Sequence, residues 1–182
     1  MAKHNIYLIG FSGSGKSATG KELSKILNMP LIEMDQQIEE KEGKKIDEIF
    51  TVKGEQYFRK IESDVLKNAA ENAGHVVATG GGAPISPLNR DLMVRTGLVI
   101  RLTATPEEIH KRISTNNRKI NQPIRPVLGQ NISIKKIKDM ITEREFAYAF
   151  SEYIIDTSGK DTLTVANTLA NLFNKWETSN ER

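Results

Sequence analysis

The chain has 182 residues, a formal net charge of +3, no cysteine and three histidines. This length suits one compact domain spanning residues 1–182, and the lack of cysteine excludes disulfides and thiolate chemistry. The histidines are scattered (His4, His75 and His110), so any bound metal should have oxygen ligands. Lysines alternate with glutamates along most predicted helices, which argues against a nucleic-acid-binding surface.

The amino terminus leads directly into a short apolar segment without a signal-peptide pattern, and no apolar run approaches the ~18 residues that a membrane span needs. We therefore expect a cytoplasmic protein without membrane association. We also expect it to act as a monomer. Basic residues outnumber acidic ones between Lys111 and Lys138. This stretch is expected to meet an anionic ligand.

Apolar runs and turn residues divide the chain into alternating strands and helices. An apolar strand over residues 6–9 precedes a glycine-rich turn and an amphipathic helix over 16–27. Thr105 and Pro106 predict a helix start, as N-cap and first helical residue. Residues 114–131 show no clear period and are predicted to form a long mobile loop. The other predicted elements are strands over 31–34, 75–79, 98–102 and 153–156, and helices over 38–42, 46–52, 57–73, 87–95, 133–150 and 161–177, with Gly43 and Gly54 as breaks.

This alternation predicts an α/β fold in which five parallel strands carry helices on both faces, giving three layers. We find no internal repeat.

A complete G-x-x-x-x-G-K-S motif runs from Gly10 to Ser17, between the first strand and the first helix. Its glycines let backbone N–H groups turn toward phosphate oxygens, and the helix amino terminus adds positive potential. Lys16 is expected to reach the β- and γ-phosphates, and the Ser17 hydroxyl to bind Mg²⁺. The predicted ATP-binding residues of this loop are Gly13, Ser14, Gly15, Lys16, Ser17 and Ala18.

Two carboxylates, Glu33 and Asp35, lie two residues apart at the end of the second strand. Strand alternation would place both on the same side, close to the loop, where one serves the metal and the other the substrate. The alternative is that acidic residues simply flank the strand, with Asp35 as the N-cap of the next helix.

Arg59 and Glu62 lie three residues apart on a predicted helix, so the carboxylate can orient the guanidinium for a substrate carboxylate. A surface ion pair is the alternative. Gly80, Gly81 and Gly82 follow the third strand, which indicates close approach of the backbone to another group, or else a flexible turn.

Three arginines are candidates for contacts with the phosphates and the substrate, because phosphoryl transfer is catalysed mainly by positioning and by surrounding cations. They are Arg118 and Arg125 in the long loop and Arg144 on the following helix. Solvated surface charge is the alternative for each.

Taken together, these residues resemble the shikimate kinase family along nearly the whole chain, from residue 6 to about 176. The resemblance rests on the G-x-x-x-x-G-K-S motif, Glu33-Met34-Asp35, Phe58-Arg59-Lys60-Ile61-Glu62, Gly80 to Gly82, Arg125-Pro126-Val127-Leu128, and Glu143-Arg144 followed by Tyr148.

This resemblance implies a nucleoside-monophosphate-kinase-like P-loop fold, with a substrate-binding helical region at about 33–62 and a lid at about 114–131. It also implies transfer of the γ-phosphoryl group of ATP, with Mg²⁺, to the 3-hydroxyl of shikimate in aromatic amino-acid biosynthesis. 

By the same resemblance, Asp35 would bind the ring hydroxyls and accept the proton. Arg59 and Arg144 would hold the carboxylate, Gly80 to Gly82 would line the pocket, and Arg118 or Arg112 would meet the nucleotide. Arg125 would contact the transferring phosphoryl group.

The chain departs from the family pattern at Glu33, where aspartate is usual, and at Glu145-Phe146, where Asn-Pro is usual. Its lid is also longer. A related kinase acting on another small carboxylated polyol, such as gluconate, is the nearest alternative. An ATP-binding regulatory module is the alternative from another class.

Overall fold

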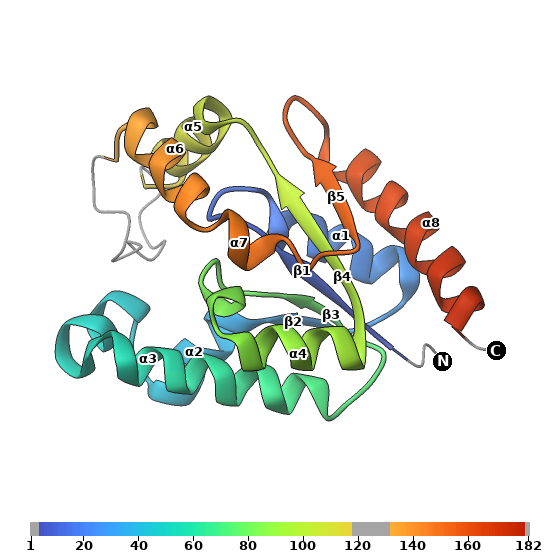
Figure 1. Cartoon of the computed structure of the whole chain (residues 1–182), viewed down its shortest axis with the longest axis horizontal. Coiled ribbons are helices and arrows are strands. Elements are labelled where there is room, and N and C mark those ends of the chain that lie inside the picture. Colours follow the sequence, from blue (N-terminus) through green and yellow to red (C-terminus); the bar gives the residue numbers. More distant parts are fainter. Residues whose placement is uncertain (1–3, 118–131, 181–182) are drawn as a thin grey trace.

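The computed structural model describes residues 4–117 and 132–180. Its centre is a five-stranded parallel sheet in the order β2-β3-β1-β4-β5 (Figure 1). The sheet predicted from the alternation of strands and helices is thereby confirmed. The strands are β1 (Asn5–Ile9), β2 (Leu31–Glu33), β3 (Val76–Ala78), β4 (Gly97–Thr103) and β5 (Tyr153–Asp156).

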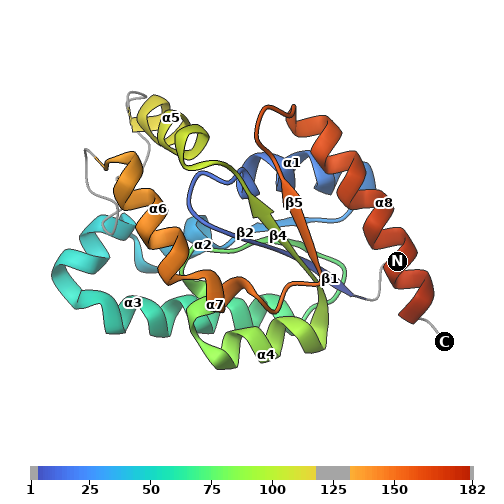
Figure 2. The same ribbon diagram turned by 45° about the horizontal axis from the view of Figure 1, so that its top comes forward.

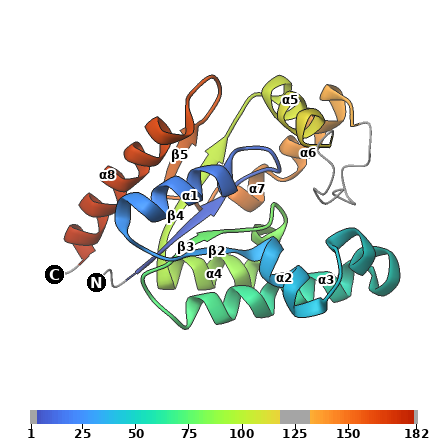
Figure 3. The same cartoon turned by 180° about the vertical axis from the view of Figure 1, so that it is seen from behind.

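Helices cover both faces of the sheet. Helices α1 and α8 lie on one face, and α2, α3 and α4 lie on the other (Figures 1 and 3). The helices are α1 (Lys16–Leu27), α2 (Met34–Glu42), α3 (Ile46–Ala70), α4 (Pro87–Thr96), α5 (Pro106–Asn117), α6 (Ile134–Glu143), α7 (Glu145–Tyr148) and α8 (Thr162–Asn180), with a 3-10 turn, η1, at Ala83–Ile85.

Alternation along the strands builds a core on each face, because successive side chains of a strand point to opposite sides. In β1, Tyr7 and Ile9 pack against α2, α3 and α4, whereas Ile6 and Leu8 pack against α1 and α8. All four side chains are fully buried. Both faces of the central strand are therefore covered, as a parallel sheet requires.

A third, smaller apolar cluster joins α5 and α6 to the loop after β1. Phe11 from that loop packs with Ile109 and Ile113 of α5 and with Ile137 of α6. The two helices lie beyond the end of β4 (Figure 2). This cluster places the helices on either side of residues 118–131 next to the glycine-rich loop.

Several boundaries differ from the predicted elements, and three of the differences lie next to the cavity-forming loops and helices. The second strand ends at Glu33, because Met34 already begins α2. Helix α5 continues to Asn117, so the first residues of the predicted loop are helical. The predicted helix over 133–150 is interrupted at Arg144, whose φ of −98° and ψ of 1° separate α6 from α7.

Gly54 was expected to break the helical region, and it does so without ending α3. Its φ of 79° and ψ of 168° are non-helical and kink the helix. The predicted mobile loop otherwise falls on 118–131, outside the described residues. Within the described part of the chain, no helix combines the length and apolarity needed to cross a bilayer.

Candidate active site

The turn between β1 and α1 forms the predicted phosphate-binding loop. Gly15 is the N-cap of α1 and has a φ of 98°, a left-handed conformation that favours glycine. No side chain of the described residues caps this helix. The amino terminus of α1 therefore faces the cavity without a capping side chain, and the helix dipole attracts phosphate to it.

Lys16 lies across this loop. Its Nζ donates hydrogen bonds to the carbonyl oxygens of Gly10 at 2.8 Å and of Phe11 at 3.0 Å. Ser17 and Ala18 follow in the first turn of α1, are exposed, and line a cavity together with Lys16. The loop thus presents an ammonium group, a hydroxyl group and a helix amino terminus to one space.

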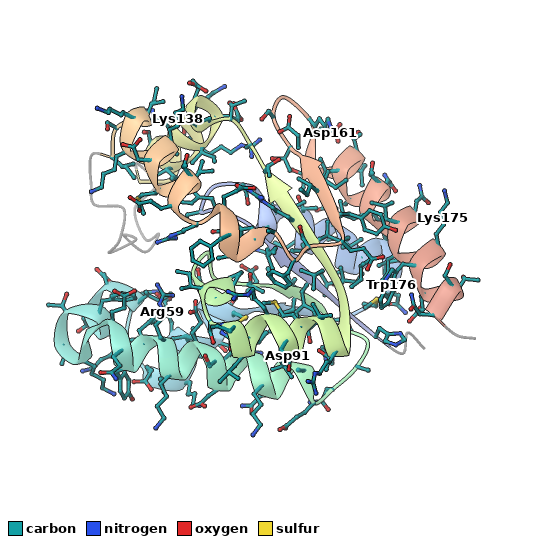
Figure 4. The ribbon with its side chains drawn as sticks, viewed as in Figure 1. Arg59, Asp91, Lys138, Asp161, Lys175 and Trp176 are labelled. Carbon is teal, nitrogen blue, oxygen red and sulfur yellow. The ribbon has the colours of Figure 1, made fainter. Side chains whose placement is uncertain are left out.

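The acceptor side of this cavity is built around Arg59. Its Nη1 donates to Glu62 Oε2 at 2.8 Å, and its Nη2 donates to Glu55 Oε1 at 3.0 Å. Figure 4 shows Arg59 on the side of α3 that faces α7. Two carboxylates therefore orient the guanidinium, which is the preparation expected for bidentate binding of a substrate carboxylate.

Glu62 is almost completely buried, with 1% of its surface exposed. This burial raises the pKa of Glu62 to about 7, an effect that Arg59 and Arg144 oppose and Asp35 reinforces. A simple surface ion pair is thus excluded for Arg59 and Glu62. The pair belongs to the interior wall of the site.

The triple glycine after β3 packs directly against these charged groups. A Cβ on Gly80 would lie 2.5 Å from Glu62 Oε1 and 3.0 Å from Asp35 Oδ1, and a Cβ on Gly82 would collide with the Arg59 guanidinium. Side chains at these positions would displace the site's own carboxylate and guanidinium. Close approach of charged side chains to the backbone therefore accounts for Gly80 and Gly82, and a flexible turn is not needed to explain them.

Arg144 reaches the same cavity from the junction of α6 and α7. Its guanidinium carbon lies 5.7 Å from the centre of the Phe11 ring. Four residues later, the hydroxyl of Tyr148 donates to the Gly81 carbonyl oxygen at 2.7 Å. Arg59 and Arg144, which lie far apart in sequence, thus line one space.

Glu33 and Asp35 both line the cavity, but not for the predicted reason. Strand alternation does not apply, because Glu33 ends β2 and Asp35 lies in the first turn of α2. Asp35 approaches Gly80, whereas Glu33 Oε1 lies 3.1 Å from Lys21 Nζ. The carboxylates therefore have different surroundings, and Glu33 is already paired with a lysine.

Sequence reasoning gave too little weight to Arg112 and did not find Thr157. Arg112 Nη1 donates to the Gly13 carbonyl oxygen at 3.2 Å and to Thr157 Oγ1 at 2.9 Å. The Thr157 hydroxyl in turn donates to the Ser14 carbonyl oxygen at 3.0 Å. These bonds connect the phosphate-binding loop with α5 and the end of β5. Contacts over such sequence separations leave no local signal.

Arg118 and Arg125 lie outside the described residues, so their assigned contacts with nucleotide stay predictions.

The cavity has a volume of about 940 Å³ and opens at the carboxyl ends of the parallel strands, where ligands of α/β sheets bind. All the described residues predicted for binding line it except Ser14, which is buried in the loop. They are Gly13, Gly15, Lys16, Ser17, Ala18, Glu33, Asp35, Arg59, Gly80, Gly81, Gly82 and Arg144.

The oxygen atoms near the loop suit Mg²⁺. Ser17, Glu33 and Asp35 line the cavity and carry oxygen atoms of the kind that Mg²⁺ prefers. No cluster of three or more histidine, aspartate or glutamate side chains within residues 4–117 and 132–180 forms a dedicated metal cage. This donor set fits Mg²⁺, which uses few protein ligands and completes its shell with phosphates and water.

A model of the family described as "Shikimate kinase" matches residues 12–173. The chain belongs to the shikimate kinase family. A shikimate kinase of Geobacter sulfurreducens is 40% identical over 166 residues, which cover 91% of this chain and 88% of that protein. One of Caldanaerobacter subterraneus is 38% identical over 162 residues, covering 89% and 91%.

Solved structures agree with this assignment. Shikimate kinase from Acinetobacter baumannii, in complex with shikimate, superimposes with a TM-score of 0.81 at 30% identity and covers 94% of this chain and 93% of its own. A gluconokinase from Sinorhizobium meliloti shares the fold alone, with a TM-score of 0.54 at 15% identity. The shikimate kinase family therefore has far closer support than the gluconate alternative.

Proposed function

We propose that this chain transfers the γ-phosphoryl group of ATP to the 3-hydroxyl of shikimate, giving shikimate 3-phosphate and ADP. One observation carries the proposal beyond family membership. The phosphate-binding loop and two arginines suited to a carboxylate, Arg59 and Arg144, line the same cavity. A donor that carries phosphates and an acceptor that carries a carboxylate can therefore meet there.

On the acceptor side, Arg59 and Arg144 bind the carboxylate and so fix the orientation of the ring. Asp35 accepts hydrogen bonds from the ring hydroxyls and takes the proton of the attacking hydroxyl. The new bond joins that oxygen to the γ-phosphorus, while the bond from the γ-phosphorus to the bridging oxygen of ADP breaks. Gly80 to Gly82 leave room for the ring between these groups.

On the donor side, the loop N–H groups and Lys16 bind the β- and γ-phosphates, and they stabilise the charge that develops on the departing oxygen. Ser17 and Glu33 would hold Mg²⁺ beside the phosphates of bound ATP, where the ion would neutralise phosphate charge. For Glu33 to contribute, its pairing with Lys21 must loosen. Arg118 and Arg125 are assigned to the nucleotide and the transferring group on the family resemblance alone.

Coupled measurement of ADP release tests the proposal, with Mg²⁺-ATP and a panel of shikimate, quinate, gluconate and AMP. We expect strong turnover with shikimate alone. Turnover with gluconate instead would keep the kinase activity and change the acceptor, and no turnover with any acceptor would favour the regulatory alternative.

We also propose that the chain acts in the cytoplasm, where ATP is supplied. We propose further that it acts as a monomer, which light scattering tests.

A further inference from the structure

A buried arginine on the sheet has no part in the chemistry described so far. Arg101 lies in β4, and 6% of its surface is exposed. Because successive side chains of a strand point to opposite faces, Arg101 lies on the same face of the sheet as Val99. Val99 belongs to the core beneath α2, α3 and α4. A charged group at a core position is costly unless it is paired, so its partners should reveal what the residue does.

Its partner is Glu145, 44 residues later and the first residue of α7. Arg101 Nη1 and Nη2 donate to the two carboxylate oxygens of Glu145 at 2.5 and 2.6 Å, which is a bidentate fork. These hydrogen bonds lower the pKa of Glu145, so the carboxylate stays ionised through the neutral range. The pair is therefore charged under the conditions in which a kinase works.

The same guanidinium also contacts Tyr148. Its central carbon lies 5.0 Å from the centre of the Tyr148 ring, within the range of a cation–π contact. Glu145 and Tyr148 are three residues apart and so share one face of the short helix α7. One side chain from the sheet thus holds both ends of a helix that is too short to be stable alone.

This short helix carries two components of the acceptor site. Arg144 immediately precedes Glu145, at the interruption between α6 and α7, and lines the cavity. The Tyr148 hydroxyl is bonded to the Gly81 carbonyl oxygen in the triple glycine. In the sheet, Arg101 is also the register partner of Ile9, the residue before the phosphate-binding loop.

We propose that Arg101 and Glu145 are positioning residues for the acceptor site, which act by fixing α7 and so aiming Arg144 and the Gly81 segment at the acceptor carboxylate. This inference rests on the proposed function, since it assumes that the acceptor carboxylate binds between Arg59 and Arg144. Neither residue touches substrate. Their loss should therefore weaken acceptor binding and leave the donor side intact.

The test compares the wild type with Glu145→Gln, Arg101→Met and the double variant, in steady-state assays that vary shikimate and ATP separately. Each single variant should raise KM for shikimate about five- to tenfold, with kcat and the KM for ATP within about twofold. The double variant should be no worse than the poorer single one, because both changes remove the same fork. Arg101→Lys, which keeps the charge and loses the fork, should fall in between.

Asp91→Asn is the matched control. It removes the carboxylate of an exposed ion pair on α4, in which Arg95 Nε lies 2.9 Å from Asp91 Oδ1. Asp91 lies away from the cavity (Figure 4). This variant should leave all constants unchanged. If burial of an unpaired Arg101 prevents Glu145→Gln from folding, Arg101→Met/Glu145→Leu replaces the pair by apolar groups and should show the same rise in KM.

The outcomes separate the two proposals. A wild-type chain that does not phosphorylate shikimate contradicts the proposed function. If the wild-type chain phosphorylates shikimate, three results from the folded variants would overturn the positioning role alone. They are an unchanged KM for shikimate, an equal rise in the KM for ATP, and single-variant effects that multiply in the double variant.

Discussion

Replacing Arg59 by methionine probes the acceptor side most sharply, because this guanidinium is oriented by Glu62 and Glu55 and packs on Gly82. A hydrogen bond to a charged group contributes about 1.5–3 kcal/mol, and each 1.4 kcal/mol is tenfold. Loss of one such bond to the acceptor carboxylate should lower kcat/KM for shikimate on the order of ten- to more than a hundredfold. The dissociation constant for ATP should stay the same.

A second effect must be separated from the first. Without Arg59, the buried Glu62 loses its closest cation, so the single variant should also be less stable. Arg59→Met/Glu62→Gln removes that unpaired charge and should recover stability while its kcat/KM for shikimate stays low. ADP release at varied shikimate and calorimetric titration with ATP provide the two readouts. Equal losses of shikimate and ATP binding in the double variant would refute the acceptor role.

Three further variants test other parts of the site. Lys16→Met removes the ammonium group bonded to the loop carbonyls and should lower kcat, measured by ADP release, roughly hundred- to thousandfold. A variant with the kcat of the wild type would contradict the role of Lys16. Gly82→Ala places a methyl group against Arg59. In the same assay it should raise the KM for shikimate by a much larger factor than the KM for ATP. Glu62→Gln should gain stability relative to wild type as pH rises from about 4.5 to 7. Because the folded-state pKa of Glu62 is raised to about 7, ionisation costs the wild type stability over this window, on the order of 3 kcal/mol in urea unfolding. A difference independent of pH would refute this.

The phosphate-binding loop was predictable because all its signals are local. Glycine spacing, an apolar strand before it and an amphipathic helix after it lie within residues 6–27, and the helix begins at Lys16 as expected. The helix start at Pro106 was predictable for the same reason, and the Thr105 hydroxyl does accept a hydrogen bond from the Glu108 N–H. Capping and glycine conformations need no distant contacts.

The acceptor side was predictable as a set of residues but not as a geometry. Glu33 and Asp35 reach the cavity from a strand end and a helix turn, because β2 ends one residue earlier than predicted and α2 already begins at Met34, before the predicted helix start at residue 38. The interruption at Arg144 was missed, since residues 133–150 have a continuous helical pattern. It coincides with the anchoring of α7 by Arg101, a contact across 44 residues that no window of sequence contains.

Identification of the product tests the central claim most directly. Phosphorus and proton NMR of a reaction with Mg²⁺-ATP and shikimate should show one shikimate 3-phosphate formed for each ADP released. ADP formed without a phosphorylated acceptor, or phosphate carried on a different hydroxyl, would contradict the proposed function.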